Sequence, residues 1–262
     1  MVGMSEPSVD FQHVSLRYRI FAERGINSFK EWAIRWITRR VRYQELVALS
    51  DICFSVTAGH TVGIIGHNGA GKSTLLRVAA GILRPTGGTA IMRGRQAPVI
   101  ELGLGFEAEL SGRENIYFNG ALLGRSPAEM EERMEEIVAF ADLHEFIDQP
   151  IRTYSTGMIA RLAFAVATTV DAQILLLDEV LAVGDASFRI KCQSRLETFR
   201  DAGVTILLVS HDLGFVAAFV RTVICVHRRV DVHPTAELDG RRVSEIYGGE
   251  VRMVHHHHRL EP

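Results

Sequence analysis

The glycine-rich stretch at residues 66–73 constrains the fold of this chain more than any other feature. It reads GHNGAGKS and fits the pattern G-x-x-x-x-G-K-S/T. Residues 62–65 are small or apolar and predict a buried strand before it, whereas residues 74–80 predict a helix after it. A chance glycine turn that carries a lysine lacks this context. The order of strand, glycine loop and helix therefore predicts a loop that binds phosphate groups.

The residues of this loop have separate expected roles. Gly66, Gly69 and Gly71 can adopt positive φ angles, which lets backbone N–H groups approach phosphate oxygens. The start of the following helix directs its partial positive charge to the same place. Lys72 is expected to reach the β- and γ-phosphates of a nucleotide, and Ser73 is expected to bind Mg²⁺.

Composition sets limits on the rest of the chain. Its 262 residues allow one large domain or a domain with a subdomain. The 29 Lys and Arg residues nearly balance 31 Asp and Glu residues, so nucleic-acid binding over a whole surface is not expected. No apolar signal segment opens the sequence and no run of about 18 apolar residues occurs, so we expect that the chain does not cross a membrane by itself.

The cysteines predict a reduced protein. Cys53, Cys192 and Cys225 lie far apart and show no metal-binding or redox spacing. We therefore expect reduced thiols in the core of a cytosolic protein. A run of histidines at His255 to His258 could bind metal or be a remnant of an expression vector.

The N-terminal region predicts a strand and then a basic helix. Val14, Leu16, Tyr18 and Ile20 alternate with polar residues, as in a half-buried strand. Tyr18 could pack on the core or stack on a nucleotide base, and spacing does not decide between them. At residues 27–42, a capping box precedes an apolar helical stripe that includes two tryptophans, with basic residues opposite. That helix could contact a membrane or partner, or it could cover the protein's own core.

The middle of the chain predicts short strands and then helices. Residues 47–56 resemble a strand pair, residues 89–93 a short strand, and residues 100–106 a hinge whose single carboxylate is Glu101. From about residue 107 to residue 172 the pattern predicts a helical subdomain. Within it, the stretch YSTGM at residues 154–158 precedes an apolar helix. Ser155 and Gly157 there could form an anion site or an ordinary helix cap.

Two further buried strands end in polar residues. Residues 174–177 are followed by Asp178 and Glu179, which suit a Mg²⁺-linked role and the activation of an attacking water, although solvated acids also end strands. Residues 204–209 are followed by His211, for which we favour sensing or polarising a phosphate over a core position. Its neighbours Ser210 and Asp212 make no catalytic triad, because triad groups converge from different elements. Residues 223–226 resemble a last strand.

The motifs GHNGAGKST, YSTGM, ILLLDE and VSHD, in this order, resemble the ATP-binding subunits of ABC transporters over about residues 9–247. The stretches ELGLGF, ELSGRENIYFNG and DEVLAVGDASF are most similar to subunits that export polysaccharides such as O-antigen, teichoic acid or capsule. The helix at residues 27–42 also resembles a gate helix of such exporters. The resemblance implies an α/β fold: a P-loop NTPase (RecA-like) core, a helical subdomain, an N-terminal antiparallel β region, and one nucleotide-binding domain over residues 1–262 with a tail at 248–262.

The resemblance also assigns roles, with ATP and Mg²⁺ as the implied ligands. Tyr18 becomes the residue that stacks on adenine, and Asp185 the acid of a loop between two subunits. Ser155 and Gly157 become signature residues that contact ATP held by a second copy. Asp178 becomes the Mg²⁺-linked acid, Glu179 the catalytic carboxylate and His211 the switch histidine, alongside Lys72. The residues of the phosphate loop are Gly66, His67, Asn68, Gly69, Ala70, Gly71, Lys72, Ser73 and Thr74.

Three departures from the common family pattern stand out. The usual signature Leu-Ser-Gly-Gly-Gln is replaced by YSTGM, a change that itself resembles the exporter group. Glu101 stands about where the family has a metal-contacting glutamine. The sequence ends soon after Tyr247, without the carbohydrate-binding extension of some O-antigen exporters, so we do not expect this subunit to select a modified chain end.

The resemblance therefore predicts a homodimeric transport ATPase on the cytoplasmic face of the membrane. It would power a separate permease that exports a lipid-linked polysaccharide. The alternative is a non-transport ATPase of the same family that acts on nucleic acid or ribosomes, or serves as an ATP-controlled scaffold. Such relatives usually carry two cassettes or a long coiled-coil insertion, and neither is found in this sequence.

Overall fold

The computed structural model describes residues 6–21, 43–100, 103, 105–169, 171–180 and 185–237. The helix expected at residues 27–42, Glu101, and the tail at residues 248–262 with its four histidines lie outside the described residues.

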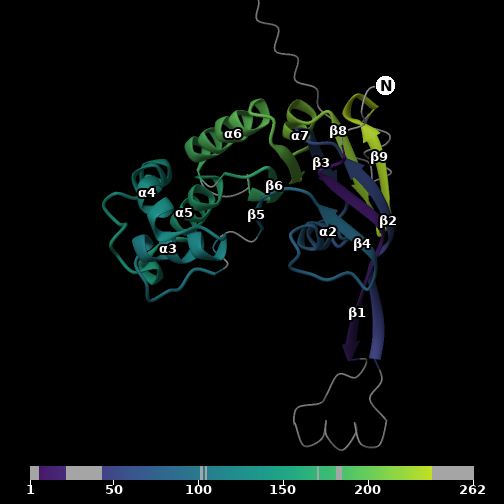
Figure 1. Ribbon diagram of the computed structural model, residues 1–262, viewed down its shortest axis with the longest axis horizontal. Helices are drawn as coiled ribbons and strands as arrows, with labels where there is room; N and C mark the ends of the chain where they lie inside the picture. Colours follow the sequence, from purple (N-terminus) through teal and green to yellow (C-terminus); the bar gives the residue numbers. More distant parts are fainter. Residues whose placement is uncertain are drawn as a thin grey trace, which may run out of the picture.

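A six-stranded sheet forms the centre of the fold (Figure 1). Its strand order is β5-β6-β7-β3-β8-β9, and all pairs are parallel except β8 with β9. The bounds are β3 Thr61–Ile65, β5 Gln96–Val99, β6 Ile174–Asp178, β7 Thr205–Val209, β8 Thr222–Val226 and β9 Val230–Pro234. The prediction that residues 223–226 form the last strand is wrong, because β9 follows and pairs with β8 at the edge.

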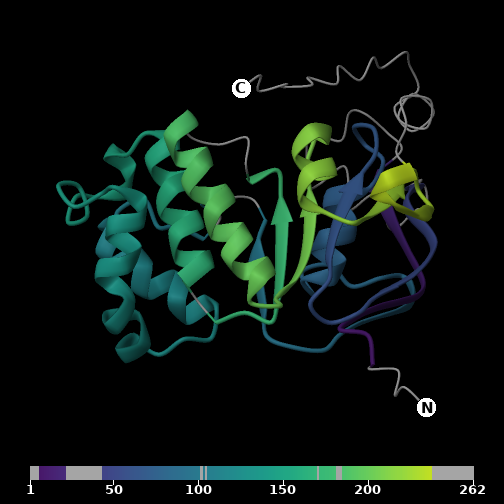
Figure 2. The ribbon, with the colours of Figure 1, turned by 90° about the horizontal axis from the view of Figure 1, so that it is seen from above.

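The central strands are buried on both faces, which explains their continuous apolar sequences. In β7, Leu207 and Val209 pack into one core, whereas Ile206 and Leu208 pack into another on the opposite face. The second core is closed by α6 (Ala186–Asp201) and α7 (Leu213–Phe219), as Figure 2 shows from above. A short 3-10 helix, η3 (Thr235–Glu237), follows β9.

A three-stranded antiparallel sheet covers the first core, in the order β2-β1-β4. Its strands are β1 (Val9–Phe21), β2 (Tyr43–Val56) and β4 (Gly87–Met92). Helix α2 (Lys72–Ala79) packs between the two sheets and contributes Leu75, Leu76 and Val78 to their shared core. The strand pair expected at residues 47–56 is instead one continuous strand, because β1 pairs with β2 along its whole length.

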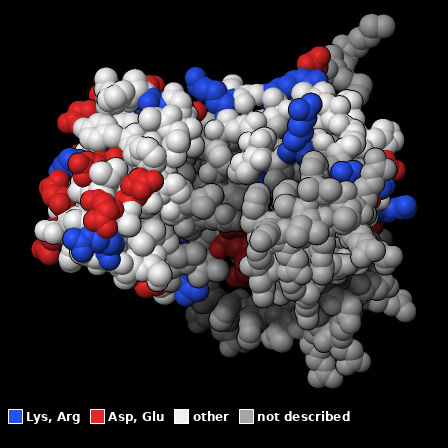
Figure 3. All heavy atoms as spheres, turned by 90° about the horizontal axis from the view of Figure 1, so that it is seen from below, with Lys and Arg blue, Asp and Glu red and all other residues white. Residues whose placement is uncertain are grey.

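The helical subdomain lies beside the sheets and has its own core. It contains α3 (Gly112–Leu122), α4 (Pro127–Ala141), the 3-10 helix η1 (Ile151–Thr153) and α5 (Thr156–Thr169). Capping boxes at Ser111 and Ser126 begin α3 and α4. On the face seen in Figure 3, acidic and basic side chains are interspersed over this subdomain rather than segregated by sign.

The cysteines are only partly as expected. Cys192 and Cys225 are buried, and burial raises the pKa of the Cys192 thiol to about 12. Cys53 is exposed on β2, so its prediction as a core thiol is wrong. Cys53 lies between the buried residues Ile52 and Phe54 on β2, so strand alternation turns its side chain to the exposed face.

Within the described part of the chain, no helix combines the length and hydropathy that crossing a bilayer requires.

Candidate nucleotide site

The glycine loop joins the end of β3 to the start of α2 and has the predicted backbone. Gly66, Gly69 and Gly71 have φ angles of 152°, 78° and 108°. A Cβ atom at Gly66 would lie 2.3 Å from the carbonyl oxygen of Val226, and one at Gly71 would lie 2.8 Å from that of Ala48. Any larger residue at these two positions would force the backbone of a neighbouring strand to move. The loop is therefore held close against β2 and β8.

Lys72 is nearly buried at the first turn of α2, with 6% of its surface exposed. Its Nζ donates hydrogen bonds to the carbonyl oxygens of Gly66 at 2.8 Å and His67 at 3.2 Å. Burial lowers the pKa of Lys72, while the negative charges of Glu179 and Asp178 act in the opposite direction. The ammonium group thus lies inside the curve of the loop. It is attracted electrostatically by both carboxylates at the end of β6.

Asp178 and Ser73 provide the oxygen atoms expected of a Mg²⁺ site. Burial raises the pKa of Asp178, and a hydrogen bond with the Ser73 side chain is the main opposing effect. Oδ1 of Asp178 is buried and has no hydrogen-bond partner among the residues that the structure describes. A buried polar atom without a partner is costly. Since Mg²⁺ binds through a few carboxylate and hydroxyl oxygens, these residues fit the ion.

Glu179 and His211 meet at the same edge of the sheet. Strands β6 and β7 are paired so that Asp178 lies opposite Val209, which places the residues that follow each strand side by side. Nε2 of His211 lies 2.9 Å from Oε1 of Glu179, and both side chains are close to half exposed. Glu179 has a φ angle of 54°, and its N–H donates to the carbonyl oxygen of Val209 at 3.0 Å. Sequence spacing places both residues at strand ends, but only the strand pairing brings them into contact.

A cavity of about 420 Å³ opens beside this pair. It lies between the strand ends and helix α6, where Arg189 and Gln193 contribute to its lining. Asp185 caps α6 by accepting hydrogen bonds from the Phe188 N–H at 2.8 Å and the Ser187 hydroxyl at 2.6 Å. Both hydrogen bonds lower the pKa of Asp185, and the bond from Ser187 has the larger effect. They favour the ionised carboxylate beside the cavity.

Ser155 and Gly157 are not joined to the loop by any hydrogen bond among the described residues. Ser155 is exposed, and its Oγ accepts a hydrogen bond from the Met158 N–H at 3.2 Å, which is the capping arrangement. A Cβ atom at Gly157 would meet only the Ser155 Oγ, at 3.8 Å. Packing within the described chain thus does not require glycine at this position. The preceding Tyr154 is a core residue whose hydroxyl donates to the Phe146 carbonyl oxygen at 2.6 Å.

Tyr18 lies on β1 near the strand on which the loop rests. It faces Leu46 of β2, two residues before Ala48, whose carbonyl oxygen packs against Gly71. Tyr18 is only partly buried and packs against the core between the sheets. It therefore has one packed side and one open side within a short distance of the loop, and both interpretations made from the sequence remain compatible with its position.

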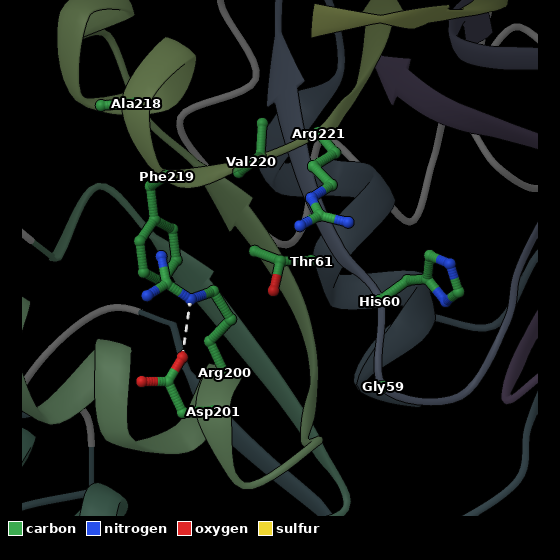
Figure 4. Close-up of a pocket in the computed structure, with 9 residues that line it drawn as sticks. All are labelled: Gly59, His60, Thr61, Arg200, Asp201, Ala218, Phe219, Val220 and Arg221. Atoms are coloured by element: carbon green, nitrogen blue, oxygen red, sulfur yellow. Dashed lines mark hydrogen bonds and ion pairs between the residues drawn. The ribbon is translucent and has the colours of Figure 1, made fainter.

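A larger cavity, of about 600 Å³, lies at the opposite edge of the central sheet (Figure 4). Thr61, at the amino end of β3, and Arg221, just before β8, contribute to its lining. Arg200 pairs with Asp201 at 3.1 Å and lies over the ring of Phe219. The carboxyl ends of α6 and α7 meet here, and their partial negative charge accounts for the nearby arginines. This cavity is thus separate from the loop and the strand ends that carry the acids.

Comparison with known proteins identifies chains of similar sequence. The chain is 42% identical over 245 residues to the O-antigen export system ATP-binding protein RfbB of Klebsiella pneumoniae, which covers 92% of this chain and 98% of that protein. It is 36% identical over 219 residues to the teichoic acids export ATP-binding protein TagH of Listeria monocytogenes, covering 84% of this chain and 64% of that protein.

Solved structures share the fold. A dimeric ATP-binding cassette in a post-hydrolysis state, bound to ADP and Pi, superposes with a TM-score of 0.69 at 21% identity, covering 87% of this chain and 98% of that chain. The family model described as ABC transporter matches residues 49–182, which contain the glycine loop, the signature stretch and both acids. The chain therefore belongs to the ABC transporter family.

Proposed function

We propose that this chain is the ATP-hydrolysing subunit of an exporter that moves a lipid-linked polysaccharide through a separate membrane permease. The relatives named for O-antigen and teichoic acid export support the class of cargo. The observation that carries the enzymatic part is the meeting of Lys72, Asp178 and the Glu179–His211 pair at the carboxyl edge of one parallel sheet. In open α/β sheets this edge is where ligands bind.

The loop and the strand ends would have separate roles in phosphoryl transfer. The N–H groups of the loop, the start of α2 and Lys72 would hold the β- and γ-phosphates of ATP. Ser73 and Asp178 would hold Mg²⁺, which, when bound, neutralises charge on the phosphate oxygens. Oδ1 of Asp178, which has no hydrogen-bond partner among the described residues, supports this assignment. No role is assigned to Glu101, which lies outside the described residues.

Glu179 is the proposed general base. Its carboxylate would orient the attacking water and accept its proton while the γ-phosphoryl group passes to the water oxygen. His211 would act as a positioning residue through its contact with Glu179, and it could donate a hydrogen bond to the γ-phosphate. Most of the rate enhancement would come from positioning and from charge stabilisation.

The complete site is proposed to need a second copy of the chain. Ser155 is exposed, and the space around Gly157 is open, so a phosphate group could approach the start of α5. Within one chain, the described residues give Ser155 no hydrogen bond to the loop. A homodimer in which each signature faces the loop of the other copy would use both features. The likeness to dimeric cassettes supports this arrangement.

A groove of about 340 Å³ is the proposed contact for the permease. It lies between α3 and α5 of the helical subdomain and the β5 edge of the central sheet. Its lining is largely apolar, and Leu122 and Ile82 remain 63% and 56% exposed at its rim. Exposed apolar surface of this kind favours a helix from another protein. Through it the cassette, proposed as one domain over residues 1–262, would be held at the cytoplasmic face of the membrane.

Glu179→Gln should lower the rate of ATP hydrolysis by about 100- to 10,000-fold, because glutamine cannot accept the proton of the attacking water. ATP affinity should stay within a few-fold, since the loop is unchanged. Glu135→Gln, which alters an exposed carboxylate beside His144 in the helical subdomain, is the matched control. Phosphate release and nucleotide binding are measured on the same preparations. Normal turnover in Glu179→Gln would remove this residue as the base.

Asp178→Asn should abolish hydrolysis and yet stabilise the nucleotide-free protein. The pKa of Asp178 is raised in the fold, so its stabilising contribution is present below the ordinary aspartate pKa and is lost as pH rises through the raised value. At neutral pH the charged, partly buried carboxylate is a cost that asparagine removes. The midpoint of thermal unfolding should rise by roughly 2–4 °C. The gain should shrink in acid, and Asp171→Asn, at an exposed ion pair, should show no such gain.

Mixing two inactive variants tests the shared site. Lys72→Ala damages the loop, and Gly157→Asp places a carboxylate in open space at the signature, where the fold can accommodate it. A mixed dimer would contain one site with both defects and one intact site, so random mixing should restore about a quarter of wild-type ATPase activity. Activity that stays absent in verified mixed dimers would contradict the shared site.

Leu122→Glu should weaken attachment to the permease while the soluble ATPase activity stays normal, because a charge at the groove opposes apolar docking. Val232→Glu changes a similarly exposed apolar residue on the edge strand β9 and serves as the control. The measurements are recovery of the chain with permease-containing membranes and polysaccharide at the cell surface. Equal recovery of both variants would exclude the groove as the docking site.

A further inference from the structure

Two β-bulges bring three metal-binding side chains together on the outer sheet, away from the nucleotide site. In the pairing of β1 with β2, Phe11 faces Phe54 and Val14 faces Ile52, so Gln12 and His13 lie opposite Cys53 alone. At the second bulge the extra residue is on β2 instead of β1. Ser50 and Asp51 there lie opposite Ser15 alone, before Leu16 faces Leu49. Asp51 and Cys53 are two residues apart on the exposed face of β2, and the first bulge brings His13 of β1 to the same face.

The bulged residues have the backbone that this arrangement needs. His13 and Asp51 have φ angles of 53° and 54°, in the left-handed region. A Cβ atom at Gly88 of β4 would lie 2.2 Å from the carbonyl oxygen of His13, so the neighbouring strand packs closely on the first bulge. The N–H of Asp51 donates to the Ser15 hydroxyl at 3.0 Å across the second bulge. The backbone that carries the side chains is therefore fixed from both sides.

The three side chains converge in solvent. Nδ1 of His13 lies 2.7 Å from Oδ1 of Asp51 and 3.5 Å from Sγ of Cys53. One ligand atom from each residue can be chosen so that all three lie within 4.8 Å of one another. The backbone N–H of His13 also donates to Sγ of Cys53 at 3.3 Å, which holds the thiol close to the imidazole. All three residues are exposed, so an ion could reach them directly.

We propose that His13, Asp51 and Cys53 form a zinc site with an open fourth position. Zinc–ligand bonds of about 2.0–2.3 Å at tetrahedral angles place nitrogen and sulfur ligands about 3.5 Å apart, which is the separation found here. The nitrogen and oxygen ligands need to separate by roughly half an ångström for the same geometry, a small change for exposed side chains. Thiolate, imidazole and carboxylate together favour zinc over magnesium or calcium. Bound zinc would join β1 to β2 across both bulges.

Cobalt(II) distinguishes this site from the histidine run at residues 255–258. Cobalt occupies zinc sites and gives an intense near-ultraviolet charge-transfer band only when a thiolate is a ligand. Imidazole ligands alone give no such band, so the histidine run does not contribute to it. Cys192 and Cys225 are buried, which leaves Cys53 as the accessible thiol of the chain's three cysteines.

The experiment titrates the reduced full-length chain with cobalt(II) and then with zinc(II). The wild-type band should saturate at one cobalt per chain and disappear when zinc displaces the cobalt. Cys53→Ser should lose the band. His13→Asn and Asp51→Asn should weaken cobalt binding at least about tenfold, and asparagine suits both because it tolerates positive φ. His144→Asn, which removes an exposed histidine paired with Glu135, should bind cobalt like the wild type.

Three results would overturn the zinc site. They are the absence of a saturable band in the wild type, a band that survives in Cys53→Ser, and an equal loss of affinity in His144→Asn. Circular dichroism of each variant identifies misfolding. ATPase activity of the wild type is measured in parallel, because the proposed site lies outside the catalytic residues.

Discussion

The parallel pairing of β3, β6 and β7 is the constraint on which the rest of the structure depends. Because these strands point the same way and are in register, their carboxyl ends meet at one edge. The glycine loop follows β3, the two acids end β6, and His211 follows β7. The apolar side chains of these strands, buried on both faces, fix the register by packing. The proposed site residues at this edge are thus positioned by apolar residues that have no proposed role in ATP hydrolysis.

Burial of polar groups at this edge makes an unfavourable contribution to the free energy of folding. Lys72 is desolvated but is compensated by two loop carbonyl groups and by nearby negative charge. Asp178 is compensated less completely, since one of its oxygens lacks a partner among the described residues. Such incomplete pairing is a cost to folding that a bound cation can repay. The proposed binding of Mg²⁺ at Asp178 would therefore offset a destabilising feature of the ligand-free fold.

Local patterns in the sequence were sufficient for the parts of the fold that local chemistry determines. The loop, the capping box at Ser126 and the acids after β6 each follow from a few neighbouring residues. The edge strands β5 and β9 were missed because their sequences, QAPV and VDVHP, lack the continuous apolar run of the central strands. The contact of His211 with Glu179, and that of His13 with Cys53, depend on register between distant segments. Register, and above all bulges, cannot be read from spacing along one strand.

The left-handed backbone at Glu179 has an evolutionary consequence. At a φ angle of 54°, glycine or asparagine would be accommodated more easily than glutamate, by about 1 kcal/mol. A lineage under selection for stability alone would therefore drift toward those residues at this position. Glutamate at this position therefore carries a cost in stability, which the proposed role of Glu179 as the general base would explain. A descendant that kept the scaffold but had lost hydrolysis would be recognisable by a smaller residue there.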